Sequence, residues 1–240
     1  MDRVRRGNWT TRRTGVRARA NRAAQAFDDL ADRYDAWYDT ESGRVLFDLE
    51  LGALRPRLAG TAGPRLEVGV GSGRFAAALG IDVGLDPAEA PLRLAKARGV
   101  RVLRGVGSQL PFGDNTFGAV ALIVTLCFVE NPAGVLAEVG RVLRPGGRLV
   151  VGLVPLDSAW GRSYEEKGRA GHPFYRHARF QTLAEHRRML ATAGFRLVEC
   201  RSTLLQTPSD EPLTEPVRRD AFAGAGFVAL AVQREDAGAD

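Results

Sequence analysis

Three glycines at alternate positions, Gly69, Gly71 and Gly73, lie in the stretch LEVGVGSGRFAAAL at residues 66–79. Glycine allows positive φ and lets the backbone approach a ligand closely. A strand that turns through such glycines into a helix is typical of a cofactor site. The turn alone fits a nicotinamide, a flavin, a nucleotide or a sulfonium cofactor, so the surrounding residues have to distinguish these classes.

An acidic residue follows at a distance that suits ribose recognition. Asp86 closes the next apolar run, 15 residues after Gly71, and an acid in this place commonly accepts hydrogen bonds from ribose hydroxyls. The spacing is somewhat below the usual one of about 20 residues, which a short intervening helix explains. Dinucleotides and S-adenosylmethionine both contain ribose, so both remain open.

Residues that could move a proton gather in the polar and aromatic segment 156–180. His172, His177 and Tyr175 are the candidates there for a general base or a substrate contact, because an acceptor hydroxyl is protonated at neutral pH and histidine is the commonest base. A histidine on a polar loop can equally be a solvated surface residue. His186, in a predicted helix rich in arginine, is interpreted as a surface residue.

The cysteines and histidines do not predict a metal centre. The chain has two cysteines and three histidines, and they lack the spacing of metal ligands. Cys127 and Cys200 fall in predicted strands, which favours buried, reduced thiols.

The elements that must position these residues are predicted from the hydrophobic pattern, which alternates between strands and helices. Such alternation predicts a mostly parallel sheet with helices on both faces. Two late alternating runs predict an antiparallel pair at one sheet edge, and two helices are expected before the first strand. The fold class is therefore α/β, Rossmann-like and doubly wound, with seven strands. The expected strands are 66–70, 81–87, 100–105, 118–129, 147–155, 195–205 and 224–233; the early helices are 21–40 and 42–58.

Charge and composition divide the chain into an arm and a body. The formal net charge is +6, and residues 1–22 alone carry +7 from eight arginines against one aspartate. We expect 1–22 to be a disordered basic arm, with attraction to nucleic acid as the alternative. Residues 23–240 are expected to form one domain with a core at 66–154 and a lid at 156–180.

Nothing in the sequence predicts a membrane span or a secretory signal. The longest apolar run, 119–129, is about half the length that crosses a bilayer, and no apolar h-region follows the early arginines. A cytoplasmic location is expected.

Four motifs carry a resemblance to a known family. EVGVGSG, GLDP, LPFGDNTFGAV and RVLRPGG occur within 66–154 in the order and spacing of class I S-adenosylmethionine-dependent methyltransferases, in the branch with small-molecule and quinone-type enzymes. YDAWYDT, the lid and GAGFVAL resemble an uncharacterised subgroup of that family. The resemblance implies S-adenosylmethionine as cofactor and the methyltransferase fold.

The resemblance also implies roles for individual residues. The three glycines of the turn and Glu67 would border the methionine end of the cofactor. Asp86 would hold the ribose, and Pro87 and Leu110 would pack on the adenine. Ser108 and Gln109 stand where the family often has an acidic adenine contact. Tyr34 and Tyr38 resemble residues that fold over the methionine part, with simple packing as the alternative. The residues assigned to the cofactor are Tyr38, Glu67, Gly69, Gly71, Gly73, Asp86, Pro87, Ser108, Gln109, Leu110 and Thr125.

One departure from the family concerns Gly118, where members commonly have aspartate after the phenylalanine. Another concerns the substrate: the fourth strand ends in VENP rather than the Asn-Pro-Pro-Tyr or Asp-Pro-Pro-Tyr of base-flipping enzymes, which disfavours nucleic acid as the acceptor.

The function we predict is methyl transfer from S-adenosylmethionine to a small-molecule acceptor by in-line displacement. The alternatives are a nicotinamide-linked oxidoreductase, and a non-catalytic cofactor-binding or nucleic-acid-associated protein that works through the arm. The sequence leaves the acceptor atom and the oligomeric state open. Aromatic residues of the lid favour an apolar or planar acceptor; they are Trp160, Tyr164, Phe174, Tyr175 and Phe180.

Overall fold

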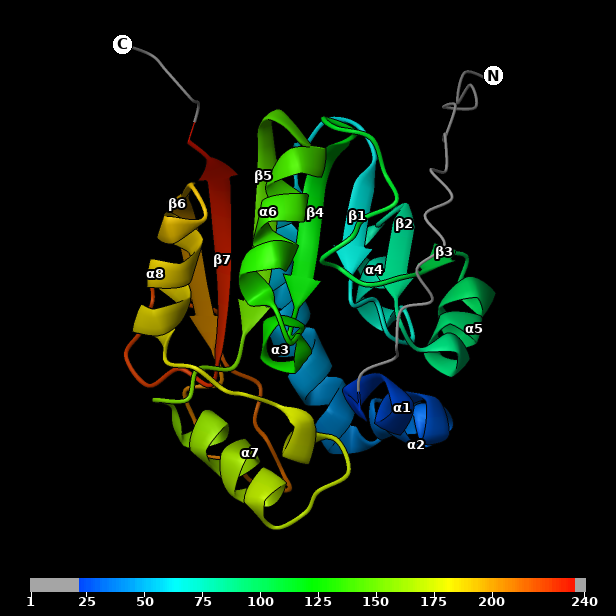
Figure 1. Cartoon of the computed structure of the whole chain (residues 1–240). Coiled ribbons are helices and arrows are strands. Elements are labelled where there is room, and N and C mark those ends of the chain that lie inside the picture. Colours follow the sequence, from blue (N-terminus) through cyan, green and yellow to red (C-terminus); the bar gives the residue numbers. More distant parts are fainter. Residues whose placement is uncertain (1–21, 236–240) are drawn as a thin grey trace.

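A seven-stranded sheet is the centre of the protein, in the order β3-β2-β1-β4-β5-β7-β6 (Figure 1). The computed structural model describes residues 22–235, and the predicted arm lies outside the described residues except for Arg22. The first five strands are parallel, and β7 is antiparallel to both β5 and β6. The predicted fold class is confirmed. The strands are β1 (Arg65–Val68), β2 (Val83–Asp86), β3 (Arg101–Arg104), β4 (Phe117–Ile123), β5 (Leu143–Leu153), β6 (Phe195–Thr203) and β7 (Phe227–Arg234).

Helices cover both faces of this sheet, as the buried residues of β4 show. Val120 and Leu122 belong to a core cluster shared with α6 and α8, whereas Ala119, Ala121 and Ile123 belong to a second cluster shared with α3, α4 and α5. Alternate side chains of a strand point to opposite faces, so both faces of β4 are apolar. The helices are α1 (Arg22–Asp29), α2 (Ala31–Trp37), α3 (Glu41–Leu58), α4 (Arg74–Leu79), α5 (Glu89–Ala97), α6 (Pro132–Val142), α7 (Ala159–Arg169) and α8 (Leu183–Thr192), with 3₁₀ turns η1 (Leu126–Phe128) and η2 (Tyr175–His177).

The fourth strand is shorter than predicted. It ends at Ile123 because Val124 has φ +50°, a conformation that β-branched residues rarely adopt. The chain then turns into η1, so Cys127 lies in this turn and not in a strand. Cys127 and Cys200 are both buried free thiols, and Cys200 does lie in a strand, β6.

Three helical segments also differ from the prediction. The expected helix 21–40 is interrupted at Leu30 and forms α1 and α2. The lid, with its weak periodicity, contains the regular helix α7, whose first turn is capped by the Ser158 side chain. His186 is buried with 3% of its surface exposed, and its Nδ1 lies 3.0 Å from the carbonyl oxygen of Thr182. The interpretation of His186 as a surface residue is wrong, because α8 turns this side of the helix inward.

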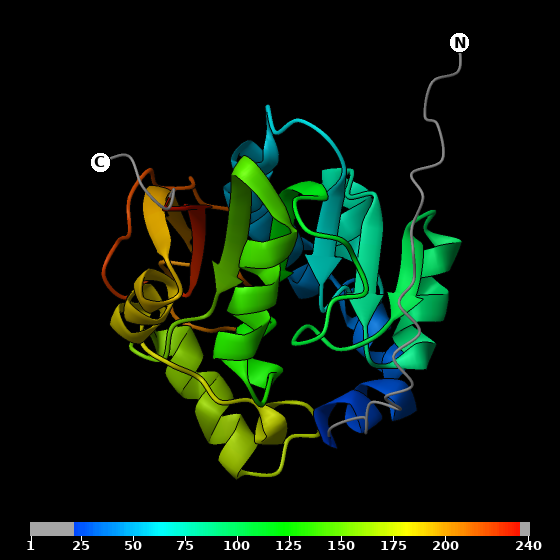
Figure 2. The ribbon, with the colours of Figure 1, turned by 45° about the horizontal axis from the view of Figure 1, so that its top comes forward.

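The carboxyl ends of the parallel strands are covered from two sides. Figures 1 and 2 both place α1 and α7 beyond the arrowheads of β1 and β4, with the amino-terminal helices on the β2 side and α7 on the β7 side. In open parallel sheets ligands bind at this end, where the strand order reverses between β1 and β4. Between residues 22 and 235 the structure has no helix of the length and apolar character that a membrane crossing requires.

Candidate active site

The glycine-rich turn connects β1 to α4 and opens onto a cavity. Gly71 has φ +51°, and no atom lies within 4 Å of the place where a Cβ would stand. Its N–H donates to Oδ2 of Asp86 over 2.9 Å, which joins the turn to the end of β2. Gly73 has a different role: a Cβ there would lie 2.7 Å from the Cβ of Ala95, so glycine lets α4 begin against α5.

The cavity at this turn has a volume of about 150 Å³. Its wall combines the turn, the ends of β2 and β4, and the amino-terminal helices α1 and α2. Seven of the residues predicted for the cofactor line it, namely Tyr38, Glu67, Gly69, Gly71, Asp86, Pro87 and Thr125. The other four, Gly73, Ser108, Gln109 and Leu110, are not part of this wall. The Leu110 N–H instead donates to Glu138 Oε2 over 2.7 Å.

Two carboxyl groups of the wall are held in low-dielectric surroundings. Glu67 is 2% exposed, and within residues 22–235 its Oε2 has no hydrogen-bond partner. Burial, with a smaller contribution from the charge of Asp86, raises the pKa of Glu67 well above its usual range. Burial also raises the pKa of Asp86 to about 6, although N–H groups of Ala88 and Gly71 donate to it. Both groups would gain from a ligand that offers hydrogen-bond donors or positive charge.

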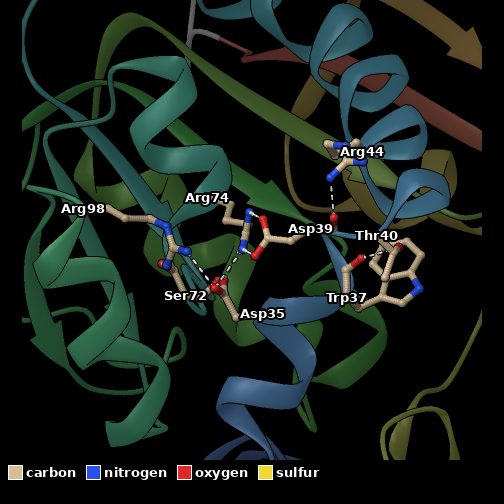
Figure 3. A network of polar contacts seen from close by, with 8 residues as sticks. All are labelled: Asp35, Trp37, Asp39, Thr40, Arg44, Ser72, Arg74 and Arg98. Atoms are coloured by element: carbon tan, nitrogen blue, oxygen red, sulfur yellow. Dashed lines mark hydrogen bonds and ion pairs between the residues drawn. The ribbon is translucent and has the colours of Figure 1, made fainter.

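A network of ion pairs fixes α2 on the glycine-rich turn (Figure 3). Arg74, at the start of α4, donates to both carboxylate oxygens of Asp35 over 2.8 and 2.9 Å and also to Asp39. Arg98 donates to Asp35 over 2.7 Å and to the carbonyl oxygen of Ser72. Burial acts to raise the pKa of Asp35, but hydrogen bonds from Arg74, Ser72 and Arg98 outweigh it and lower that pKa to about 2. This anchoring holds Tyr34 and Tyr38 on the cavity wall.

The three residues predicted for proton transfer, His172, Tyr175 and His177, lie at two different places in the structure. His172 stacks on Tyr175 with ring centroids 4.4 Å apart, and its Nδ1 is 3.4 Å from the Phe174 nitrogen and 3.5 Å from the Tyr175 nitrogen. Burial and the charge of Lys167 lower the pKa of His172, which favours the neutral ring. His177 lies apart, accepting from Arg176 Nε over 3.0 Å on the wall of a second cavity. None of the three lines the cavity at the turn.

Several wall residues were not found from the sequence. Phe27 stacks at 4.9 Å from Phe174 and meets Phe128 edge to face at 5.3 Å. Val124, with its strained backbone, also lines the wall. The acidic partners of Arg74 had a signal in the sequence, since Asp35 and Asp39 are four residues apart and would share one face of the predicted helix 21–40. In the described part of the chain, no group of three or more His, Cys, Asp or Glu residues could hold a metal ion.

A doubly wound sheet of this strand order, with a glycine-rich turn after β1 and an acid at the end of β2, defines a class I methyltransferase. Residues 66–151 match the family described as methyltransferase domain. The chain belongs to the S-adenosylmethionine-dependent methyltransferases, and the predicted family, activity and cofactor are confirmed.

Three similar proteins illustrate the relationship. A crystal structure of an S-adenosylmethionine-dependent methyltransferase of Thermotoga maritima, titled a possible histamine N-methyltransferase, has 33% identity and a TM-score of 0.81; the match covers 89% of this chain and 100% of that one. An uncharacterized protein of Mycobacterium tuberculosis is 46% identical over 209 residues, covering 87% of this chain and 73% of the relative. Demethylmenaquinone methyltransferase of Renibacterium salmoninarum is 34% identical over 151 residues, covering 58% and 61%.

The wall of the cavity fits the cofactor of this family. S-adenosylmethionine carries an ammonium group and two ribose hydroxyls, and the wall offers the unpartnered Glu67 oxygen and the Asp86 carboxyl. When bound, the cofactor supplies a methyl group that its sulfonium has already activated for transfer.

We expect Asp35→Asn to loosen α2 from the turn, because the amide cannot hold both arginines as the carboxylate does. The variant should be cleaved faster by chymotrypsin within residues 22–40 and should bind S-adenosylhomocysteine about tenfold more weakly, a loss of about 1.4 kcal/mol. Asp32→Asn, an exposed position on the same helix, is the control. Equal cleavage of the two variants would contradict the anchoring role.

Proposed function

We propose that this methyltransferase acts on a small-molecule acceptor bound next to the cavity at the glycine-rich turn, under cover of α1, α2 and α7. The observation that carries the proposal is the enclosure itself: the cavity wall continues from the turn into aromatic residues of the amino-terminal helices. Phe27 and Tyr34 of these helices contact Phe174, next to η2.

We assign the cofactor to the wall residues as follows. The Glu67 carboxyl receives the ammonium group, and the Asp86 carboxyl receives the ribose hydroxyls. Pro87 offers a flat apolar surface to the adenine, while Tyr34 and Tyr38 cover the methionine part. Ser108, Gln109 and Leu110 remain predictions for the adenine edge, and Gly73 acts through the packing of α4.

The residues of the enclosure contribute orientation and exclusion of water. Transfer from a sulfonium needs an in-line approach in a dry site, and much of the rate comes from fixing the two reactants. Tyr34 and Tyr38 hold each other through their hydroxyls, 3.3 Å apart, which stiffens the wall where the acceptor enters. We retain His172 and Tyr175 as candidates on the acceptor side, and His177 as a candidate at the second cavity.

A cytoplasmic location is part of the proposal. It rests on the two free thiols, Cys127 and Cys200, because reduced cysteines are typical of reducing compartments.

Calorimetric titration tests the cofactor assignment. We expect the protein to bind S-adenosylhomocysteine and not NADH. Asp86→Ala removes the acceptor of two backbone N–H groups and of the ribose, and each hydrogen bond to a charged group contributes about 1.5–3 kcal/mol. Affinity should therefore fall about a hundredfold or more, while the exposed control Asp48→Ala keeps it. Binding of NADH alone, or undiminished affinity in Asp86→Ala, would refute the assignment.

A further inference from the structure

One carboxyl group near the active site has no part in the contacts described so far. Glu50 lies on α3, three residues after Phe47 and four before Leu54. Residues at these spacings share one face of a helix. Phe47 and Leu54 both pack into the core cluster beneath the sheet, so Glu50 lies on the inward face of α3.

Tyrosines from three other elements surround this position. Phe47 meets Tyr38 with ring centroids 5.8 Å apart, and Tyr38 and Tyr164 are packed against the same core cluster. Burial, with a smaller contribution from the charge of Glu50, raises the pKa of four tyrosines: Tyr34 of α2, Tyr38 directly after α2, Tyr164 of α7 and Tyr175 of η2. Glu50 therefore lies one helical turn from Phe47, on the side of α3 where Phe47 contacts Tyr38.

Contacts between aromatic rings connect these tyrosines, and Phe174 joins the two groups by contacting both Tyr34 and His172. Tyr164 and Tyr175 stack with centroids 4.5 Å apart, and Tyr175 stacks in turn on His172. Tyr34 meets Tyr38 edge to face at 5.7 Å. The negative faces of aromatic rings attract cations, with tyrosine among the better partners.

Glu50 itself lacks a counter-charge. In the described part of the chain no hydrogen bond or ion pair reaches its side chain, whereas Asp35 of α2 and Asp39 in the turn after it are both paired with arginine. Its side chain is half-buried and is not part of the fully buried core. Burial raises the pKa of Glu50 to about 8, which is the signature of a carboxyl group held without a cation.

We propose that Glu50 and the tyrosines Tyr34, Tyr38, Tyr164 and Tyr175 bind the methyl acceptor, and that this acceptor is an organic amine that enters as its ammonium ion. This inference rests on the proposed function and specifies its substrate class. The ammonium pairs with the Glu50 carboxylate and lies against the tyrosine rings. Before transfer the nitrogen must release a proton: the N–H bond breaks, an O–H bond forms on Glu50, and the electron pair stays on nitrogen. The amine and the Glu50 carboxyl are then both neutral, which lowers the cost of burying them.

A second cavity offers the opposite chemistry. It measures about 360 Å³, shares Ala23, Phe128 and Val129 with the first, and is lined by three arginines, Arg22, Arg176 and Arg179, against one acidic residue, Glu130. These arginines would attract an anionic acceptor. The two sites therefore predict acceptors of opposite charge, which one set of probes can distinguish.

The test is calorimetric titration in saturating S-adenosylhomocysteine with three probes of similar shape: 2-phenylethylamine, the neutral 2-phenylethanol and the anionic 3-phenylpropanoate. We expect the amine to bind at least tenfold more tightly than either analogue. Glu50→Gln should lower amine affinity at least tenfold and leave S-adenosylhomocysteine affinity unchanged. Asp48→Asn, an exposed carboxyl two residues earlier on α3, should change neither.

Three results would overturn the inference: equal amine affinity in Glu50→Gln, tighter binding of the alcohol or the propanoate, and no binding of the amine by a protein that binds S-adenosylhomocysteine. A protein that fails to bind S-adenosylhomocysteine would contradict the proposed function itself, and the inference with it.

Thermal melts across pH provide a second readout that needs no ligand. The pKa of Glu50 is raised from 4.5 to about 8 in the folded protein, so the stability that the neutral carboxyl contributes is complete below pH 4.5 and is lost as pH rises to about 8. The facing tyrosines titrate above pH 10 and do not interfere. Glu50→Gln does not titrate, so its melting temperature should exceed that of wild type increasingly from pH 5 to pH 8.5. A constant difference would show that Glu50 is solvated, and would also overturn the inference.

Discussion

Gly71→Arg is expected to abolish binding of S-adenosylhomocysteine while the chain remains folded. The place of its Cβ is free of neighbours, and Gly71 lines the cavity of about 150 Å³, so we expect the arginine side chain to occupy that cavity. A site that encloses most of its ligand cannot hold both ligand and arginine, and we expect affinity to fall by more than about a hundredfold. Titration calorimetry measures the loss, and circular dichroism verifies the fold.

The matched control for this variant is Gly60→Arg. Gly60 also has positive φ, +72°, also has free space around its Cβ position, and lies exposed after α3. Both variants carry the same backbone strain of about 1–2 kcal/mol, so the difference between them isolates the cavity. If both variants bind S-adenosylhomocysteine as wild type does, the turn is not part of the cofactor site.

Gly118→Asp, which restores the residue common in the family, is expected to destabilise this protein severely. Gly118 is buried in β4 at a register irregularity, and its N–H donates to the Pro64 carbonyl oxygen over 2.9 Å. A Cβ at this position would overlap the carbonyl group of Ala62. Backbone overlap and a buried carboxylate together should lower the free energy of unfolding by at least about 3 kcal/mol. Urea denaturation followed by fluorescence gives the value.

Gly113→Asp serves as the control for that substitution. Gly113 is exposed, and the nearest atom to its Cβ position is Thr116 Oγ1 at 3.7 Å, so the same change should alter stability by less than about 0.5 kcal/mol. Similar unfolding midpoints for the two variants would mean that the segment before β1 yields readily to a side chain at position 118.

The sequence was most informative where local pattern and sheet topology agree. The glycine-rich turn and Asp86 occupy neighbouring strand ends, and parallel strands bring such ends together, so the Gly71 to Asp86 hydrogen bond follows from the order of the elements. The end of β4 could not be predicted, because Val124 adopts a conformation contrary to its own preference. Tertiary contacts determine where this strand ends.

The proposed acceptor side was less predictable because its residues are distant in sequence. Glu50 has the periodicity of a core helix around it, and only the folded structure brings α3 and α7 into one core cluster and stacks Tyr164 of α7 on Tyr175 of η2. His186 illustrates the same limit: Arg187 and Arg188, which follow it directly, suggested a solvated helix face, yet α8 turns this one side chain inward. Charged neighbours in the sequence do not predict whether a residue is exposed when one face of its helix is buried and the other is solvated.

The cavity wall has an evolutionary consequence. Residues 66–151 supply the turn, the acid of β2 and the end of β4, but α1 and α2, which complete the wall, lie outside this shared segment. Mutations in the amino-terminal helices can therefore reshape the enclosure without touching the groups at the strand ends. Under the proposed function, a substitution on the inner side of α1 or α2 would alter the cover of the site while the glycine-rich turn and Asp86 stay in place.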